Sequence, residues 1–396
     1  MHAHPTSGVA PFDINSIFRA HGQQFRRQHR LSREQHRALD DLERCRTSAL
    51  GGHLYRCKHC AAEVALYNSC LNRHCPTCQA PAQLRWVEQR KLRLLPTDYF
   101  HLVFTLPAAL RPLALRCRRP IFDLLFAAAA QTLLTLGGDP KRLGASIGFT
   151  LVLHTWKKDL QFHPHVHGIV SGGGLDLHAD RWKAARRNYL FPGKVLSRLF
   201  RGKFLAGLID LHNSGALTGI DQPALLNLIR SVRNLDWVVF AKRPFGGPEQ
   251  IVRYLGLYTH RVAISNSRLL DVHDDRITFR TRGEGTCSIS PDEFIRRFVQ
   301  HVLPDRFVKI RHYGLLAPSH VNTHLKRAQQ LLSQQPQSPE LNHEDVQAQS
   351  RTTNPEPPST DHLPRCPHCG QRALIRLTTK QHSAYHHHSG APRPDT

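Results

Sequence analysis

The chain has 396 residues, and its 54 Lys and Arg residues exceed its 30 Asp and Glu residues by 24. Its length predicts more than one domain, and a hydrophobic fraction of 40% is sufficient for buried cores, so a disordered tail or a small disulfide scaffold is excluded. The net charge of +24 predicts a polyanionic partner, with nucleic acid the first candidate and an anionic membrane the second.

The hydropathy pattern argues against a membrane partner. A membrane-spanning helix needs about 18 uninterrupted apolar residues, whereas the longest apolar run, residues 124–136, is interrupted by Gln131 and Thr132. Residues 1–5 lack the charged and apolar regions of a secretory signal. We therefore expect a cytoplasmic protein, in which closely spaced cysteines bind metal more often than they form disulfides.

Six of the ten cysteines lie between residues 45 and 78. Two C-x₂-C pairs at this spacing are typical of four thiolates that bind one structural zinc ion. The predicted ligands are Cys57, Cys60, Cys75 and Cys78. Further residues of the region could form a second site or compete for the first: Cys45, Cys70, His53 and His74. Because Arg and Lys residues are interleaved, we expect this zinc-binding module, residues 12–98, to recognise DNA.

The next elements mix strand and helix patterns. Residues 99–107 are aromatic and β-branched and end at a proline, which predicts a strand. Residues 110–136 have helical spacing and end at two glycines, which predicts a buried helix. Cys117 within it and Cys287 further on stand alone and are interpreted as small core residues.

A histidine-rich segment follows. Residues 148–155 and 165–170 predict two antiparallel strands joined by a turn at residues 157–160. Because side chains alternate along a strand, His163, His165 and His167 share one face, and apolar residues share the other. The turn places His154 opposite His165, so three histidines could meet around one cation. A solvated histidine-rich strand face is the alternative.

Beyond the hairpin we predict a basic helix at residues 194–211, a strand at 237–241, a helix that begins near residue 248, and a basic hairpin at 261–270 and 275–282. Tyr254 and Tyr258 are four residues apart, so on a helix their side chains are neighbours. An aromatic core stripe is the alternative, but Arg253, His260 and Arg261 flank the pair and suit a phosphate better. Phosphodiester cleavage by a tyrosine hydroxyl would use both the histidine cluster and the tyrosine pair, since a phenol needs activation or a metal-polarised phosphate.

The last part of the chain differs in composition. Residues 331–362 are rich in Gln, Ser and Pro and are interpreted as a disordered linker. The tail, residues 363–396, contains Cys366 and Cys369, half of a zinc ribbon that only His382 or one of the histidines at 386–388 could complete locally.

The motifs together resemble the two-tyrosine HUH transposases of rolling-circle insertion sequences. The resemblance extends over about residues 12–320 and rests on the cysteine-rich module, on residues 100–107 and 153–156, on the histidine motif at 163–167 and on residues 254–264. It implies an α+β fold in which a central antiparallel sheet carries the histidines, with the nuclease domain at residues 99–320.

The resemblance also implies a set of functional residues. His165 and His167 would bind catalytic Mg²⁺ or Mn²⁺, and Tyr254 and Tyr258 would form 5′-phosphotyrosine links in turn. His154 as third ligand is an inference from the hairpin, with His163 as its rival.

The implied substrate is single-stranded or hairpin DNA at the element ends, with host replication enzymes as partners of rolling-circle transposition. Binding would use a basic groove and aromatic stacking. Groove candidates are Arg253, Arg261, Arg268, Arg181, Trp182, Lys183, Arg186 and Arg187.

Three other interpretations remain open from the sequence. A plasmid replication initiator or relaxase would share the chemistry but act at an origin. A zinc-dependent DNA-binding regulator would bind duplex DNA and form no covalent adduct. A carboxylate-triad transposase would need an ordered acidic set, which we do not find.

Overall fold

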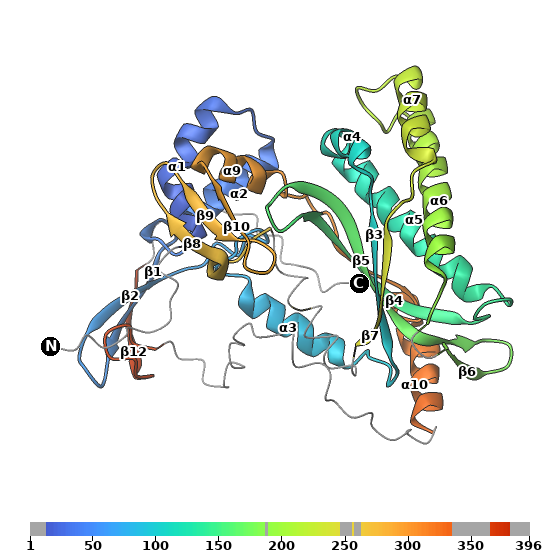
Figure 1. Cartoon of the computed structure of the whole chain (residues 1–396). Coiled ribbons are helices and arrows are strands. Elements are labelled where there is room, and N and C mark those ends of the chain that lie inside the picture. The colour runs from blue at the N-terminus through green and yellow to red at the C-terminus, as the bar shows by residue number, and fades with distance from the viewer. Residues whose placement is uncertain (1–12, 187–188, 246–255, 257–262, 335–364, 381–396) are drawn as a thin grey trace. The chain divides into compact units, whose positions relative to one another are not determined.

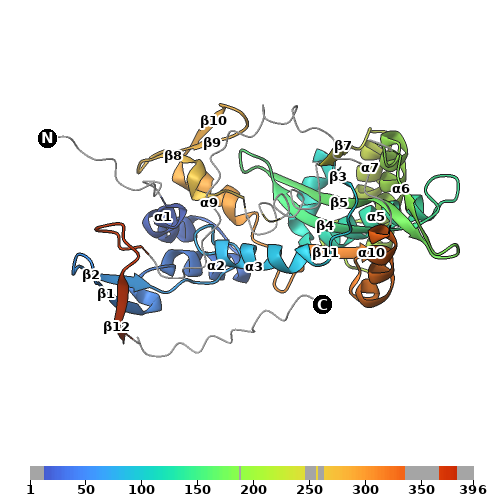
Figure 2. The same ribbon diagram turned by 90° about the horizontal axis from the view of Figure 1, so that it is seen from below.

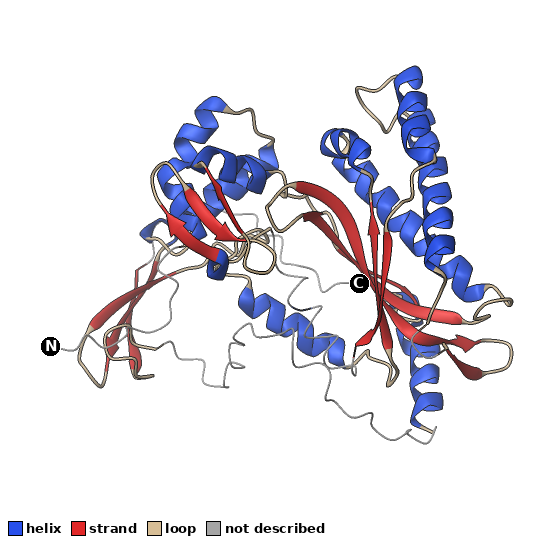
Figure 3. Ribbon diagram, in the orientation of Figure 1, coloured by secondary structure: helices blue, strands red, loops and turns tan. Residues whose placement is uncertain are grey.

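The computed structural model describes residues 13–186, 189–245, 256, 263–334 and 365–380. These residues form helices and antiparallel sheets (Figures 1 and 3), which confirms the α+β class. They divide into two compact units. One unit contains the short helical turn η1 (Ser48–Leu50) and the strands β1 (Gly52–Cys57), β2 (Glu63–Tyr67) and β12 (Leu374–Lys380), and the other contains the remaining helices and strands.

The helices are α1 (Ile14–Gln28), α2 (Arg33–Arg44), α3 (Ala80–Lys91), α4 (Arg111–Arg116), α5 (Arg118–Gly138), α6 (Gly193–Asn213), α7 (Gln222–Arg233), α9 (Pro291–Val299) and α10 (Lys326–Ser333). Short helical turns are η1 (Ser48–Leu50), η2 (Ala108–Leu110), η3 (Asn266–Arg268), η4 (Pro318–His320) and η5 (Val321–Leu325). The strands are β1 (Gly52–Cys57), β2 (Glu63–Tyr67), β3 (Tyr99–Thr105), β4 (Ser146–Trp156), β5 (Phe162–Asp176), β6 (Arg181–Ala184), β7 (Val239–Phe245), β8 (Leu269–Val272), β9 (Ile277–Arg280), β10 (Thr286–Ile289), β11 (Ile310–Gly314) and β12 (Leu374–Lys380).

The larger unit is built on a six-stranded antiparallel sheet. Its strand order is β11-β4-β5-β3-β7, and β6 pairs with β5. The long strands β4 and β5 form the expected hairpin, and His154 pairs directly with His165 in its register. Leu160 ends the turn with a φ of 65°, a left-handed conformation that closes the reversal of the chain.

One face of this sheet is covered by α4, α5 and α6 (Figures 1 and 2). The apolar side chains of the hairpin, such as Leu153 and Val166, point into this core and are fully buried. Phe104 of β3 meets Phe200 of α6 edge to face, with ring centroids 5.1 Å apart. Burial of one complete face fixes the register, because a slip of one residue would turn every side chain over.

The helix expected at residues 110–136 is present, but it consists of α4 and α5 with a break between them. The break lies at Cys117, whose φ of −110° and ψ of 57° are not helical. By length and hydropathy α5 is apolar enough to cross a membrane. Because 61% of its most apolar window is buried inside the protein, it is better explained as a core helix.

The opposite face of the sheet has a smaller core. Val152 and Ile169 of the hairpin pack there with Leu315 and Tyr99. Burial raises the pKa of the Tyr99 hydroxyl to about 12, so the hydroxyl stays neutral. It accepts a hydrogen bond from the Leu95 N–H at 2.8 Å. The histidines of the hairpin lie on this same face of the strands.

A three-stranded sheet, β8–β9–β10, follows the segment that contains the tyrosines. β8 and β9 form a hairpin with β10 as an added strand, but the first strand covers residues 269–272 rather than the expected 261–270. Cys287 lies on β10 and is half-buried rather than a core residue. Close by in sequence, α9 packs on α1, where Phe298 and Phe18 meet at 4.9 Å between ring centroids.

The smaller unit is a three-stranded antiparallel sheet in the order β12-β1-β2. The C-terminal segment is therefore not the separate tail expected at residues 363–396, because β12 uses the backbone hydrogen bonds of β1 along residues 52–57. The expected linker also begins later, since residues 331–333 complete α10.

Candidate functional site

Three imidazoles converge where β4 and β5 run side by side. The ring nitrogens of His154, His165 and His167 lie within 4.8 Å of one another. His154 is 3% exposed, and the other two are half-buried. The alternation expected for the motif is observed, because the histidines lie on one face of β5 while Val166 is completely buried on the other.

Hydrogen bonds orient two of these rings. His165 Nδ1 lies 2.7 Å from the His163 carbonyl oxygen, which only accepts, so Nδ1 carries the proton and Nε2 keeps its lone pair. His167 Nδ1 lies 2.8 Å from His101 Nε2. The Nε2 atoms of His165 and His167 are therefore the atoms available to a cation, an arrangement typical of metal-binding histidines.

His101 is a site residue that the sequence did not reveal. It comes from β3, is 4% exposed, and its ring is stacked parallel to that of His167 with an interplanar angle of 6°. The sequence predicted a strand at residues 99–107, but the contact depends on the pairing of β3 with β5, where Val103 lies opposite His167. No local pattern specifies that pairing.

Burial keeps the imidazoles of the site neutral. Desolvation lowers the pKa of His165 to about 4, and it lowers the pKa of His167 well below its usual value, with the neighbouring histidines adding to the effect. Metal ligation requires neutral imidazole. His165 and His167 thus present lone pairs at neutral pH without competition from protons, and together with His154 they could hold one divalent cation.

His163, the rival third ligand, is directed elsewhere. Its Nδ1 lies 3.0 Å from the Arg111 guanidinium, which can only donate, so this nitrogen is an acceptor. The pKa of His163 is lowered to about 4, first by burial and then by His165 and Arg111. The geometry therefore favours His154 over His163 in the cluster.

The hairpin turn beside the site is held from outside by His301. This buried imidazole bonds Thr155 Oγ1 at 3.1 Å through Nδ1 and the Leu160 carbonyl oxygen at 2.9 Å through Nε2. Burial lowers the pKa of His301 to about 4. Because the turn sets which residue faces His165, these two bonds help to keep His154 in the cluster.

Eight of the ten cysteines form two groups of four, and the grouping differs from the expected one. Cys57 and Cys60 lie with Cys366 and Cys369, whereas Cys75 and Cys78 lie with Cys45 and Cys70. Sulfur atoms in each group are within 4.8 Å of one another. The expected set of Cys57, Cys60, Cys75 and Cys78 is thus divided between two clusters, because the C-terminal pair takes the place beside Cys57 and Cys60.

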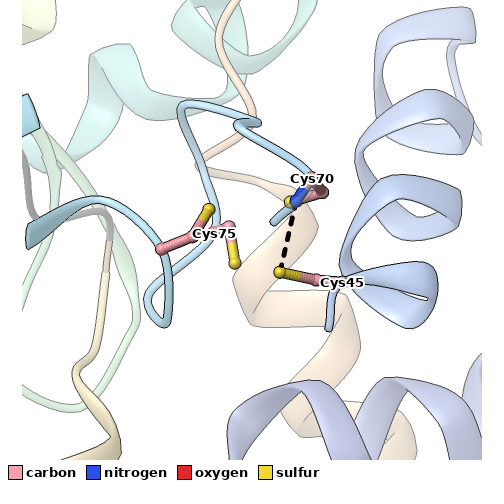
Figure 4. Close-up of side chains that lie close together, drawn as sticks. Cys45, Cys70 and Cys75 are labelled. Atoms are coloured by element: carbon pink, nitrogen blue, oxygen red, sulfur yellow. Dashed lines mark hydrogen bonds between the residues drawn. The ribbon is translucent and has the colours of Figure 1, made fainter. Parts of the chain in front are cut away.

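The cluster of Cys45, Cys70, Cys75 and Cys78 is mostly buried. Figure 4 shows Cys45, Cys70 and Cys75 of this cluster. The Cys70 N–H donates to Cys45 Sγ at 3.5 Å. The Asn15 amide lies 3.5 Å from Cys75 Sγ. Buried thiolates with N–H donors are typical of structural zinc sites, in which such hydrogen bonds orient the ligands.

The two histidines that could have competed for zinc have other contacts. His74 Nε2 accepts the Leu303 N–H at 3.1 Å, and its Nδ1 lies 3.0 Å from Asn72 Oδ1. Both nitrogens of His74 are thus engaged, and burial lowers its pKa well below the usual value. His53 lies on β1 and meets Tyr55 edge to face.

The expected DNA-contacting residues have different outcomes. Arg268 is half-buried, and its guanidinium donates to the carbonyl oxygens of Arg280, Lys158 and Ala263. Trp182 is 7% exposed, so its ring is not free to stack on a base. Lys183 forms an ion pair with Asp176 at 2.8 Å. Five expected residues lie outside the described part of the chain: Tyr254, Tyr258, Arg253, Arg261 and Arg187.

Two family models match the chain. A transposase zinc-binding domain matches residues 17–106, and the transposase family Y2_Tnp matches residues 148–324. The first match spans six cysteines, and the second spans the histidine hairpin and the two tyrosines. Neither match reaches Cys366.

Two curated relatives cover most of the chain. A protein of Sinorhizobium fredii that is named as a transposase, y4qJ, is 41% identical over 379 residues, which are 92% of this chain and 94% of the relative. The transposase for insertion sequence element IS801 of Pseudomonas savastanoi pv. phaseolicola is 32% identical over 294 residues, which are 69% and 68% of the two chains. No solved structure matches.

Proposed function

The chain belongs to the insertion-sequence transposase family that includes the IS801 transposase, and on this premise we propose that it cleaves and rejoins single-stranded DNA through a tyrosine ester. A transposase acts on DNA, which agrees with the net charge of +24. The observation that carries the proposal is the convergence of His154, His165 and His167 on one face of the sheet.

The histidine cluster fits a divalent cation such as Mg²⁺ or Mn²⁺. Its nitrogens converge within 4.8 Å, and the Nδ1 atoms of His165 and His167 are already hydrogen-bonded, so both Nε2 atoms can face one ion. When bound there, the ion supplies Lewis-acid polarisation of a scissile phosphate. His101 holds the His167 ring in place, and the buried apolar face of β5 keeps the histidine strand from shifting.

Tyr254 and Tyr258 are the proposed nucleophiles. The attack of one phenolic oxygen on a backbone phosphorus forms a 5′-phosphotyrosine ester and releases a 3′-hydroxyl, so the phosphodiester energy is conserved for rejoining. The family match over residues 148–324 includes both tyrosines. A free 3′-hydroxyl can prime host DNA synthesis, and the second tyrosine can then serve the transfer to a target strand.

The proposed substrates are single-stranded or hairpin DNA ends of the element, with Arg253 and Arg261 near the phosphates; Arg268 is left out, because its guanidinium donates to backbone carbonyl oxygens. A basic surface of this kind binds less tightly as salt concentration rises. The matching element ends and host replication enzymes are the remaining partners, and we place the reaction in the bacterial cytoplasm at the nucleoid.

The test uses a labelled single-stranded DNA end, purified protein and Mn²⁺. Wild-type protein should form a covalent protein–DNA adduct, and the double variant Tyr254→Phe/Tyr258→Phe should form none. Tyr189→Phe is the matched control, because Tyr189 is a 46% exposed tyrosine of the same unit. Adduct formation or nicking by the double variant would refute the proposed nucleophiles. Specific duplex binding without any adduct in wild type would instead identify a regulator.

A further inference from the structure

Cys366 and Cys369 complete a four-cysteine cluster with Cys57 and Cys60, at the other end of the chain. Cys57 Sγ lies 3.6 Å from Cys369 Sγ, and Cys60 Sγ lies 3.7 Å from Cys366 Sγ. A tetrahedron with Zn–S bonds of about 2.3 Å has S···S edges of about 3.8 Å. A disulfide needs about 2.05 Å. The separations therefore match a tetrathiolate site and not a pair of disulfides.

The two halves of this cluster have the same sequence pattern. Residues 57–60 read Cys-Lys-His-Cys, and residues 366–369 read Cys-Pro-His-Cys. Both therefore carry a histidine at the same place within a C-x₂-C pair. Both histidines are exposed, which leaves the four sulfur atoms as the groups that converge.

The two halves also have the same backbone. In the first, the Ala61 N–H donates to the Cys57 carbonyl oxygen at 2.9 Å, and the Cys57 N–H donates to the Ala62 carbonyl oxygen at 2.9 Å. In the second, Gly370 and Gln371 make the same two bonds with Cys366, each at 2.8 Å. The fifth residue of each turn is left-handed, with φ of 58° at Ala61 and 73° at Gly370.

A left-handed alanine is uncommon, because its Cβ clashes with the backbone in this conformation. Ala61 nevertheless adopts the conformation that Gly370 adopts freely. The same turn is thus formed twice, once against the local preference of the sequence. Such a turn aims two sulfur atoms at one point, which is the requirement of a zinc knuckle.

The strands hold the halves together. Cys57 lies opposite Leu374 in the β1–β12 register, and the Lys58 N–H donates to the Ala373 carbonyl oxygen at 2.7 Å. The buried cluster at this place contains only Cys57, Cys366 and Leu374 among the described residues. Units with so small a core usually need a metal or a disulfide to stay folded.

We propose that Cys57, Cys60, Cys366 and Cys369 bind one structural zinc ion, so that the C-terminal segment is an integral part of the zinc-binding unit. This site is separate from the cluster of Cys45, Cys70, Cys75 and Cys78, and it does not depend on the nuclease chemistry. The bound ion fastens β12 to β1 and completes the three-stranded sheet.

The experiment measures zinc per chain by elemental analysis of the full-length protein, purified under reducing conditions. Cys366→Ser/Cys369→Ser should lose one zinc ion per chain, and Cys57→Ser/Cys60→Ser should lose the same one. The variant with all four substitutions should lose no more than either pair. Full zinc content in Cys366→Ser/Cys369→Ser would overturn the proposal, and so would a loss of two ions in the quadruple variant.

Two controls separate ligand loss from general damage. Cys287→Ser removes a cysteine outside both clusters and should keep all the zinc. His59→Ala/His368→Ala alters both knuckles without touching a sulfur and should also keep it; loss of zinc there would overturn the four-sulfur set. In cobalt-substituted protein, the difference spectrum between wild type and Cys366→Ser/Cys369→Ser should show thiolate-to-cobalt bands of a tetrahedral site. An empty difference spectrum contradicts the assignment.

Discussion

The hydrogen bond between His101 and His167 leads to a quantitative prediction for the proposed nuclease site. Replacing His101 by Phe keeps a ring of similar size but removes the partner of His167 Nδ1, 2.8 Å away. Because His101 is only 4% exposed, water cannot readily replace the lost partner. Loss of such an outer partner costs about 10–100-fold in metal affinity, which is about 1.4–2.7 kcal/mol. An unsatisfied buried donor costs about 1–3 kcal/mol, which is the same range.

The assay is a titration with Mn²⁺ in which free Mn²⁺ is measured by electron paramagnetic resonance, so no DNA cleavage is needed. His165→Ala/His167→Ala should abolish binding at the site, and His101→Phe should weaken it 10–100-fold, as estimated above. His101→Gln should recover part of the affinity, since an amide oxygen can accept the Nδ1 proton.

The matched control is His312→Phe. His312 lies on β11 of the same sheet and bonds Thr150 Oγ1 at 2.9 Å, away from the three converging histidines. If His101→Phe binds Mn²⁺ as well as wild type while the far-ultraviolet circular dichroism is unchanged, His101 does not position His167. Equal weakening by His312→Phe would show a general loss of sheet stability instead.

Three further predictions concern stability. Burial lowers the pKa of His301 to about 4, so the unfolded chain binds more protons than the folded chain between pH 6.5 and 4. The free energy of unfolding therefore falls as the pH falls through that window, by up to about 3 kcal/mol from this residue. When urea unfolding is compared at pH 7 and pH 5, His301→Gln should show a smaller pH dependence than wild type. Phe104→Ala should lower the free energy of unfolding in urea by about 3–5 kcal/mol, because the ring is fully buried against Phe200. Phe240→Ala, at a 48% exposed phenylalanine of the adjacent strand, should lower it by less than about 1 kcal/mol. Equal losses in the two variants would contradict the assignment of the core. Ala61→Gly should strengthen zinc retention against a chelator about fivefold, and Gly370→Ala should weaken it similarly, since each changes the free energy of a left-handed conformation by about 1 kcal/mol. The Cβ added in Gly370→Ala makes no new contact, because no other atom lies within 4 Å of its position.

The histidine hairpin was predictable because its information is local. A period of two along residues 162–168 separates the apolar face from the histidine face, and a single short turn leaves few registers open. His154 therefore pairs with His165 as the sequence indicated. The α+β class was implied by the resemblance to the HUH transposases, and the described helices and antiparallel sheets confirm it.

The cysteine partners were not predictable in this way. The spacing within each C-x₂-C pair indicates a knuckle, but it contains no information about which other knuckle it meets. Cys75 and Cys78 were the nearest complete pair to Cys57, whereas the structure brings Cys366 and Cys369 there through the β1–β12 pairing. The contact of His101 with His167 was hidden for a similar reason, because it depends on strand pairing between segments 66 residues apart.

Because β1 pairs with β12, the zinc-binding unit can be completed only when the end of the chain has been synthesised. Cys57 and Cys369 are 312 residues apart, so at about 5–20 residues per second the ribosome needs about 15–60 s to make the second thiol after the first. During that interval Cys57 and Cys60 are a newly made dithiol without their final companions. The thiols of the β1–β2 hairpin must stay reduced on the nascent chain until the last segment emerges. A chain truncated before that segment lacks two of the four thiols of this zinc site.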